Sequence, residues 1–255
     1  MIEGINLRKV FKSGLFGNKK VVAVDGVSIK IEKGETLGLI GESGSGKSTL
    51  GRLLLMLIKP DSGKVLYDGV DITRLKSKEL RMFRRKMQLI PQHPYDALDP
   101  RWKLYDSIAE PLRIHKLVED KEEERTKVLE LVESVNLKEE LLDRYPHELS
   151  GGELQRAVIA RALALQPEFI VCDEPTSMLD ISTQASIIRL LLELQKRYKI
   201  SYLFITHDLE LASVVADRIA VMYKGKIVEE GKPKEILEDP KHNYTKKLVE
   251  NIVNF

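Results

Sequence analysis

The chain has 255 residues, of which 43% are hydrophobic, and its formal net charge is +2. This length allows one large domain, and the balanced charge predicts neither nucleic acid nor an acidic molecule as a partner. Cys172 is the single cysteine, which excludes an internal disulfide framework. The N-terminal residues lack a signal-peptide pattern, and no apolar run reaches the roughly 20 residues that a membrane-spanning helix needs.

Strand patterns dominate the N-terminal third of the chain. Apolar residues alternate over residues 21–31, which predicts half-buried antiparallel strands. The apolar run Thr36–Ile40 predicts a buried strand, and residues 50–58 predict a helix. A second strand pair is expected between residues 64–67 and Met87–Ile90.

The middle of the chain, residues 94–165, is expected to form a helical subdomain. Val128, Leu131, Val132 and Val135 repeat at the spacing of one helix face. The charged opening of that helix, residues 119–125, is expected to be solvated.

The rest of the chain alternates helix and strand. Helices are expected over 153–165, 182–198 and 209–216, with buried strands over 169–172 and Ser201–Thr206. This alternation predicts a parallel sheet with crossover helices. Residues 218–230, interrupted by Lys224 and Gly225, predict a terminal hairpin. The fold class is therefore α/β, with a mixed or parallel sheet, an antiparallel β part and an inserted helical part.

A phosphate-binding loop is the strongest chemical signal. Residues 41–49 read Gly-Glu-Ser-Gly-Ser-Gly-Lys-Ser-Thr, which fits G-x-x-x-x-G-K-[ST] between a strand and a helix. Backbone N–H groups and the positive end of the helix dipole suit phosphate oxygens. Lys47 would reach the β- and γ-phosphates, and Ser48 would bind Mg²⁺. The expected contacts in this loop are Gly41, Ser43, Gly44, Gly46, Lys47, Ser48 and Thr49.

Two carboxylates follow the apolar strand that contains Cys172. Asp173 suits the acidic position that holds Mg²⁺ in phosphate-loop enzymes. Glu174 could act as the general base on an attacking water molecule. Cys172 is expected to be a small buried side chain.

A second helix start carries exposed backbone N–H groups. Ser150 is expected to cap the helix that follows it, and Gly151 and Gly152 leave N–H groups accessible. An ordinary capped helix explains this pattern, but so does a site in which one ATP is held between two chains.

These motifs, in this order, resemble those of ATP-binding cassette (ABC) ATPases over essentially the whole chain. The resemblance implies one nucleotide-binding domain over residues 1–255, ATP and Mg²⁺ as ligands, and head-to-tail dimers. Ser150, Gly151 and Gly152 of one copy would then contact the ATP that Lys47 of the other copy holds.

The resemblance also assigns roles to single residues. Gln92 matches the glutamine that approaches Mg²⁺ and the attacking water, so the expected metal ligands are Ser48, Gln92 and Asp173. His207 matches the histidine that contacts the γ-phosphate and positions Glu174. Asp180 matches the aspartate that couples the two sites of a dimer.

Adenine stacking has two candidates. Family members use an aromatic side chain in the first strands, and Phe11 has the favoured position. Phe16 is the alternative, because residues 13–20 read as an inserted loop.

Several stretches resemble the ATPase subunits of oligopeptide and dipeptide importers, including residues 24–27, 143–152 and 172–177. His93, Asp99 and Met178 depart from the usual residues of that branch. The resemblance implies two membrane permease subunits, a second ATPase chain of the same or a different kind, and an extracytoplasmic solute-binding protein. The expected location is the cytoplasmic face of the cell membrane.

The sequence also admits alternative functions. Nickel and oligosaccharides are alternative cargoes of the same branch. A soluble cassette ATPase that acts on nucleic acid or ribosomes is disfavoured, because only about a hundred residues separate the phosphate loop from Ser150. A non-hydrolysing regulatory subunit is disfavoured by the presence of Glu174 and His207.

Overall fold

The structure is a computed structural model that describes residues 1–13 and 19–253. The chain forms two compact units, which are described separately. Unit 1 comprises Met1–Arg84 and Lys199–Phe255, and unit 2 comprises Arg85–Tyr198. In the part of the chain that the structure describes, no helix combines the length and the apolar character needed to cross a bilayer.

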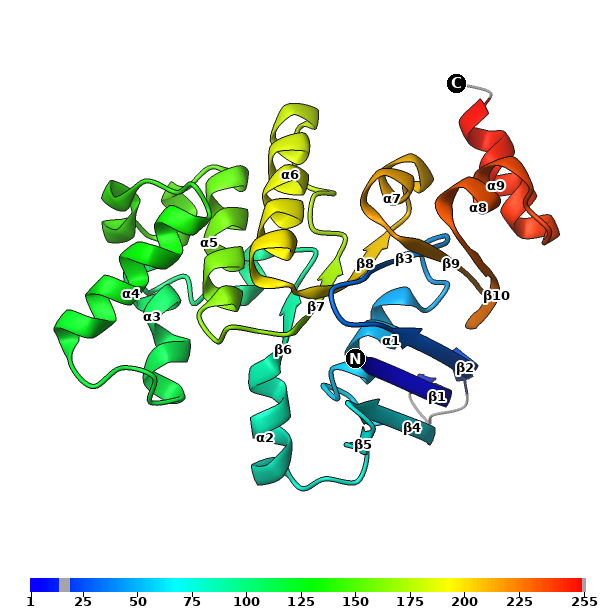
Figure 1. Ribbon diagram of the computed structural model, residues 1–255, viewed down its shortest axis with the longest axis horizontal. Helices are drawn as coiled ribbons and strands as arrows, with labels where there is room; N and C mark the ends of the chain where they lie inside the picture. Colours follow the sequence, from blue (N-terminus) through cyan, green and yellow to red (C-terminus); the bar gives the residue numbers. More distant parts are fainter. Residues whose placement is uncertain (14–18, 254–255) are drawn as a thin grey trace. The chain divides into compact units, whose positions relative to one another are not determined.

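One sheet of unit 1 is antiparallel and has the order β2-β1-β4-β5 (Figure 1). Its strands are β1 (Ile2–Ser13), β2 (Lys19–Ile31), β4 (Ser62–Tyr67) and β5 (Val70–Asp71). Val24, Val27, Ile29 and Ile31 of β2 are buried, while their neighbours in sequence are more exposed. The prediction of half-buried antiparallel strands over 21–31 is confirmed, because β2 pairs antiparallel with β1.

The other strands of unit 1 follow the order β10-β9-β3-β8, with β3 parallel to both of its neighbours. They are β3 (Thr36–Ile40), β8 (Ser201–Thr206), β9 (Arg218–Tyr223) and β10 (Lys226–Gly231). Every residue of β3 and β8 is buried, as expected for strands covered on both faces. The predicted terminal hairpin is confirmed by the antiparallel pair β9 and β10.

Within residues 1–13 and 19–253, five helices have most of their residues in unit 1. They are α1 (Lys47–Leu54), α2 (Ser77–Lys86), α7 (Leu209–Val215), α8 (Pro233–Glu238) and α9 (Asn243–Val253). A core cluster joins the end of β3 to α7, α8, α9 and β9 through Ile40, Leu209, Ile219, Ile236 and Tyr244. The C-terminal helix is therefore packed into the same core as the strand that precedes the phosphate loop.

Unit 2 contains the parallel strand pair β6 (Met87–Ile90) and β7 (Phe169–Asp173). Its helices are α3 (Leu104–Ile114), α4 (Lys121–Ser134), α5 (Gly151–Leu163) and α6 (Ile181–Tyr198). Three short 3₁₀ helices connect them: η1 (Pro94–Ala97), η2 (Glu139–Asp143) and η3 (Pro146–Glu148).

The predicted strand pair between residues 64–67 and Met87–Ile90 is wrong. Both segments are strands, but β4 pairs with β1 and β5, whereas β6 pairs in parallel with β7. Alternating hydrophobicity shows that a segment can be a strand, but the partner is chosen by the surfaces that fold together.

The predicted amphipathic helix is α4, with Val128 and Val132 buried and Val135 buried at its C-cap. The prediction of a solvated opening is wrong for Glu124, which is only 7% exposed. Glu124 accepts two hydrogen bonds from the Arg113 guanidinium and one from Tyr105 Oη. A buried carboxylate with a fixed cation is indistinguishable in sequence from a solvated one.

Candidate nucleotide-binding site

The phosphate loop connects β3 to α1 and wraps around the Lys47 side chain. Lys47 is 5% exposed, and its Nζ lies 2.6 Å from the carbonyl oxygen of Gly41 and 3.0 Å from that of Glu42. Helix α1 begins at Lys47, so the positive end of its dipole lies at the loop. The loop therefore concentrates a cation and backbone donors at one place.

Two glycines are required because the loop runs against neighbouring backbone. A Cβ on Gly41 would lie 2.2 Å from the Met222 carbonyl oxygen, and one on Gly46 would lie 2.1 Å from the Ala23 carbonyl oxygen. Both glycines also have a positive φ, of 152° and 109°. Gly44 has a φ of 78° with open space around its Cβ position. The tight packing of Gly41 and Gly46 fixes the path of the loop.

Ser45 is a loop residue that the sequence analysis did not single out. Its Oγ is buried and has no hydrogen-bond partner in the structure, while its carbonyl accepts from the Gly225 N–H at 2.9 Å. A buried hydroxyl without a partner fits a loop that closes around an anionic ligand, because the hydroxyl can donate to an anion. In the sequence, only its position inside the phosphate-loop motif pointed to Ser45.

His207 lies near the phosphate loop because of strand register. Ile40, the last residue of β3, pairs with Thr206, the last residue of β8. Gly41 and His207 therefore leave the sheet at the same edge of unit 1. His207 is exposed, and the Thr206 Oγ1 accepts from the Asp208 N–H at 3.0 Å, which holds the turn.

Gln92 and Glu174 are in direct contact in unit 2. Ile90 of β6 pairs with Cys172 of β7, and Gln92 and Glu174 each lie two residues beyond this pair. Gln92 Nε2 donates to Glu174 Oε2 at 3.2 Å. Glu174 also has a φ of 46°, a conformation that few non-glycine residues adopt. Two residues predicted to act on water thus lie together, 82 positions apart in sequence.

Asp173 ends β7 as a buried carboxylate, with 5% of its surface exposed. Cys172 before it is fully buried, as expected, and burial raises the pKa of its thiol. A carboxylate at a strand end is the kind of hard oxygen ligand that Mg²⁺ prefers.

The helix α5 begins with a capping box, which confirms Ser150 as its N-cap. Ser150 Oγ accepts from the Glu153 N–H at 3.4 Å, and Glu153 Oε2 accepts from the Ser150 N–H at 2.9 Å. Both Ser150 and Gly151 are exposed. A Cβ on Gly152 would lie 2.6 Å from Thr183 Cγ2, so Gly152 lets α5 approach the start of α6.

Asp180 lies directly before α6 and accepts hydrogen bonds from the first turn of that helix. Its Oδ1 accepts from Ser182 Oγ at 2.6 Å and from the Thr183 N–H at 3.0 Å. These two donors hold the pKa of the Asp180 carboxyl well below its usual range. The exposed Asp180 and the start of α5 are therefore neighbours, linked through Thr183.

Phe11 lies near the end of β1 with 42% of its surface exposed, so its ring is available for stacking. Lys9 Nζ lies 5.8 Å from the ring centroid. The alternative, Phe16, lies outside the described residues.

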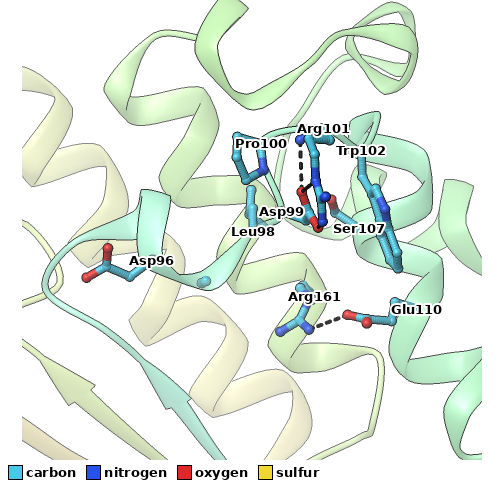
Figure 2. Close-up of a pocket in the computed structure, with 10 residues that line it drawn as sticks. Asp96, Leu98, Asp99, Pro100, Arg101, Trp102, Ser107, Glu110 and Arg161 are labelled. Atoms are coloured by element: carbon cyan, nitrogen blue, oxygen red, sulfur yellow. Dashed lines mark hydrogen bonds and ion pairs between the residues drawn. The ribbon is translucent and has the colours of Figure 1, made fainter.

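A pocket of about 560 Å³ opens in unit 2 close to Gln92 in sequence (Figure 2). Its wall combines residues 96–102 with Ser107 and Glu110 of α3 and Arg161 of α5. Arg161 donates to Glu110 at 2.5 Å, and Arg101 pairs with Asp99 at 2.7 Å. The Arg101 side chain lowers the pKa of Asp99 to about 2. Both ion pairs and the Trp102 ring face this pocket in Figure 2.

Comparison with known proteins identifies the family. The family model described as ABC transporter matches residues 24–177. The chain belongs to the ABC transporter family. Among its relatives, the oligopeptide transport ATP-binding protein OppF of Bacillus subtilis (strain 168) is 52% identical over 233 residues, which cover 91% of this chain and 76% of the relative.

Two further comparisons agree with this membership. The dipeptide transport ATP-binding protein DppF of Haemophilus influenzae is 44% identical, over 98% of this chain and 77% of the relative. A dimeric post-hydrolysis structure of the ATP-binding cassette MJ0796, bound to ADP and Pi, superposes with a TM-score of 0.83 at 32% identity. That match covers 91% of this chain and 99% of the other. The chain is an α/β ATPase of the ABC family, and the predicted fold class is confirmed.

Proposed function

We propose that this chain is the ATP-hydrolysing subunit of an importer for oligo- or dipeptides. The names of its relatives support peptides over the alternative cargoes, nickel and oligosaccharides. We further propose that residues 1–255 act as one nucleotide-binding domain, in which residues 94–165 form the helical subdomain. The hydrogen bond between Gln92 and Glu174 carries the catalytic part of the proposal.

The phosphate loop is proposed to bind ATP through the N–H groups of residues 41–49 other than that of Glu42, which donates to Tyr244 Oη. Lys47 Nζ, which now contacts two loop carbonyls, would exchange them for phosphate oxygens. Ser48, Asp173 and Gln92 each offer an oxygen donor that fits Mg²⁺, which when bound neutralises charge on the phosphate oxygens. Phe11 would stack on the adenine ring.

Glu174 is proposed as the general base. Its carboxylate would accept a proton from the attacking water, and the Gln92 amide fixes the orientation of that carboxylate by donating to Oε2. His207, at the edge of the sheet beside the phosphate loop, would donate to the γ-phosphate. Developing charge would thus meet donors that are already in place.

A second ATPase chain, identical or different, is proposed to complete each site head to tail. The exposed N-terminus of α5 supports this. Ser150, Gly151 and Gly152 lie at the positive end of the helix dipole, where N–H groups outside the capping box can bind a phosphate. Asp180, fixed beside Thr183, would transmit the state of one site to the other.

Two permease subunits are proposed as membrane partners, which places the chain at the cytoplasmic face of the membrane. The pocket lined by residues 96–102 supports a docking site just after Gln92 (Figure 2). The permeases would connect the chain indirectly to a solute-binding protein. Nucleic acid is not a proposed partner.

The test is the Glu174→Gln variant, with Glu168→Gln at the opposite end of β7 as its matched control. Loss of a general base should slow phosphate release about 10²–10⁴-fold, while the control keeps the rate of the unmodified protein. Glu174→Gln should also accumulate as an ATP-bound dimer in size-exclusion chromatography.

The same variant, pulled down with Mg-ATP from detergent-solubilised native membranes, tests the transport assignment. Recovery of integral membrane proteins with a solute-binding protein is the expected result. Unchanged phosphate release would refute the role of Glu174, and recovery of only ribosomes or nucleic acid would refute the transport role.

A further inference from the structure

A tyrosine from the C-terminal helix contacts the phosphate loop. Tyr244 lies in the first turn of α9, and its Oη accepts a hydrogen bond from the Glu42 N–H at 2.9 Å. The two residues are 202 positions apart in sequence. Tyr244 lies outside residues 41–49, and the motif by itself gives no sign of this contact.

The bond acts on the peptide group that also holds Lys47. The N–H of Glu42 and the carbonyl of Gly41 belong to one planar peptide unit, in which they point in opposite directions. The carbonyl accepts from Lys47 Nζ at 2.6 Å. Fixing the N–H on one side therefore also fixes the acceptor on the other side.

Tyr244 is itself held firmly in unit 1. Its ring is 7% exposed and stacks on Tyr223 of β9 with centroids 4.2 Å apart. The preceding turn is fastened to β10, because the Glu229 carboxylate accepts from the N–H groups of Lys241 and His242 at 2.7 and 2.9 Å. The hydroxyl is thus presented by a packed ring rather than by a mobile side chain.

The alternative is that Tyr244 only fills the core. Packing explains the ring, which contacts the cluster around Ile40 and Ile236. It does not explain the hydroxyl, because phenylalanine would fill the same space without burying a polar group. The hydroxyl instead accepts a hydrogen bond from the N–H of Glu42, which lies in the loop before α1.

We propose that Tyr244 is a positioning residue that holds the 41–42 peptide of the phosphate loop in the geometry that accepts ATP. This inference rests on the proposed role of the loop in binding the nucleotide phosphates. The C-terminal helix would thereby set the nucleotide affinity of the chain, without itself contacting the nucleotide.

The test is Tyr244→Phe, which keeps the stacked ring and removes the acceptor. Loss of one hydrogen bond that preorganises the loop should raise the Kd and KM for MgATP about five-fold, which is about 1 kcal/mol. The kcat should stay within about two-fold, because no group that reacts has changed. In the nucleotide-free protein, the Glu42 amide should exchange its hydrogen faster.

Tyr223→Phe is the matched control, since it removes the hydroxyl of the other ring in the same stack and leaves the Glu42 bond in place. It should leave Kd, KM and amide exchange unchanged. Equal effects of the two variants would reduce Tyr244 to a packing role, and unchanged Kd and amide exchange in Tyr244→Phe would overturn the inference.

Lys47→Ala separates this inference from the assignment of the loop. If Lys47→Ala abolishes MgATP binding while Tyr244→Phe has no effect, the loop binds ATP and the positioning role is wrong. If Lys47→Ala binds MgATP normally, the assignment of the loop itself fails, and the role of Tyr244 fails with it.

Discussion

The buried carboxylate of Glu124 offers a direct test of the energetics of the helical region. Its side chain is 9% exposed, and it accepts from Arg113 Nε and from a second guanidinium nitrogen, each at 2.6 Å. Tyr105 Oη adds a third bond at 3.1 Å. Glu124→Gln keeps the shape of the side chain but removes its charge and replaces one acceptor oxygen with an NH2 donor, so it disrupts these bonds without opening a cavity.

The expected loss is about 2 kcal/mol in the free energy of unfolding at neutral pH. Hydrogen bonds to charged groups contribute roughly 1.5–3 kcal/mol, and the value is reduced here because the Arg113 side chain is 42% exposed. Asp106→Asn removes the other partner of the same arginine, an exposed carboxylate at 2.9 Å. This control should cost about 0.5 kcal/mol or less.

Urea unfolding followed by tryptophan fluorescence is the appropriate assay. Trp102 is the only tryptophan of the sequence and lies in unit 2, as Glu124 does. With a slope of about 2 kcal/mol per molar urea, Glu124→Gln should lower the midpoint by about 1 M.

The destabilisation should also depend on pH. Arg113, as the main cause, lowers the pKa of Glu124 from its usual value of 4.5. A carboxylate with a lowered folded-state pKa stabilises the protein above the unfolded-state value, and this stabilisation is lost as pH falls through the folded-state pKa. The gap between Glu124→Gln and the unmodified protein should therefore shrink below about pH 4.5. Equal effects of Glu124→Gln and Asp106→Asn at neutral pH, or a gap that does not change with pH, would refute this reasoning.

Two further predictions concern the backbone of the phosphate loop and the Cys172 thiol. Gly41→Ala should lower the free energy of unfolding by about 3 kcal/mol or more, because its Cβ would lie 2.2 Å from the Met222 carbonyl oxygen. A Cβ on Gly44 would meet no neighbouring atom, so Gly44→Ala should lower the free energy of unfolding only by the left-handed backbone strain, about 1 kcal/mol. Similar losses for the two variants in chemical denaturation would contradict this geometry. Cys172 should react with a thiol reagent only after unfolding, because burial encloses the thiol and raises its pKa; rapid reaction of the native chain would show that β7 is accessible.

The sequence by itself determined the features that depend on neighbouring residues. The spacing of residues 41–49 specifies the phosphate loop, because the required glycines, Lys47 and Ser48 all belong to one short segment. Ser150 and Glu153, three residues apart, likewise specify the helix cap. The run Thr36–Ile40 matched β3 at both ends, since a fully buried strand is apolar throughout.

Only the tertiary structure decided which distant segments meet. Sequence periodicity predicted strands at 64–67 and Met87–Ile90 but paired them wrongly, because strand partners are chosen by shared buried surfaces. Family resemblance supplied roles for Gln92 and Glu174, but their contact follows from the register of β6 and β7. The bond between Tyr244 and Glu42 spans 202 positions and depends on packing of α9 into the core of unit 1. No local pattern encodes such a bond, because its two partners meet only when the intervening chain has folded.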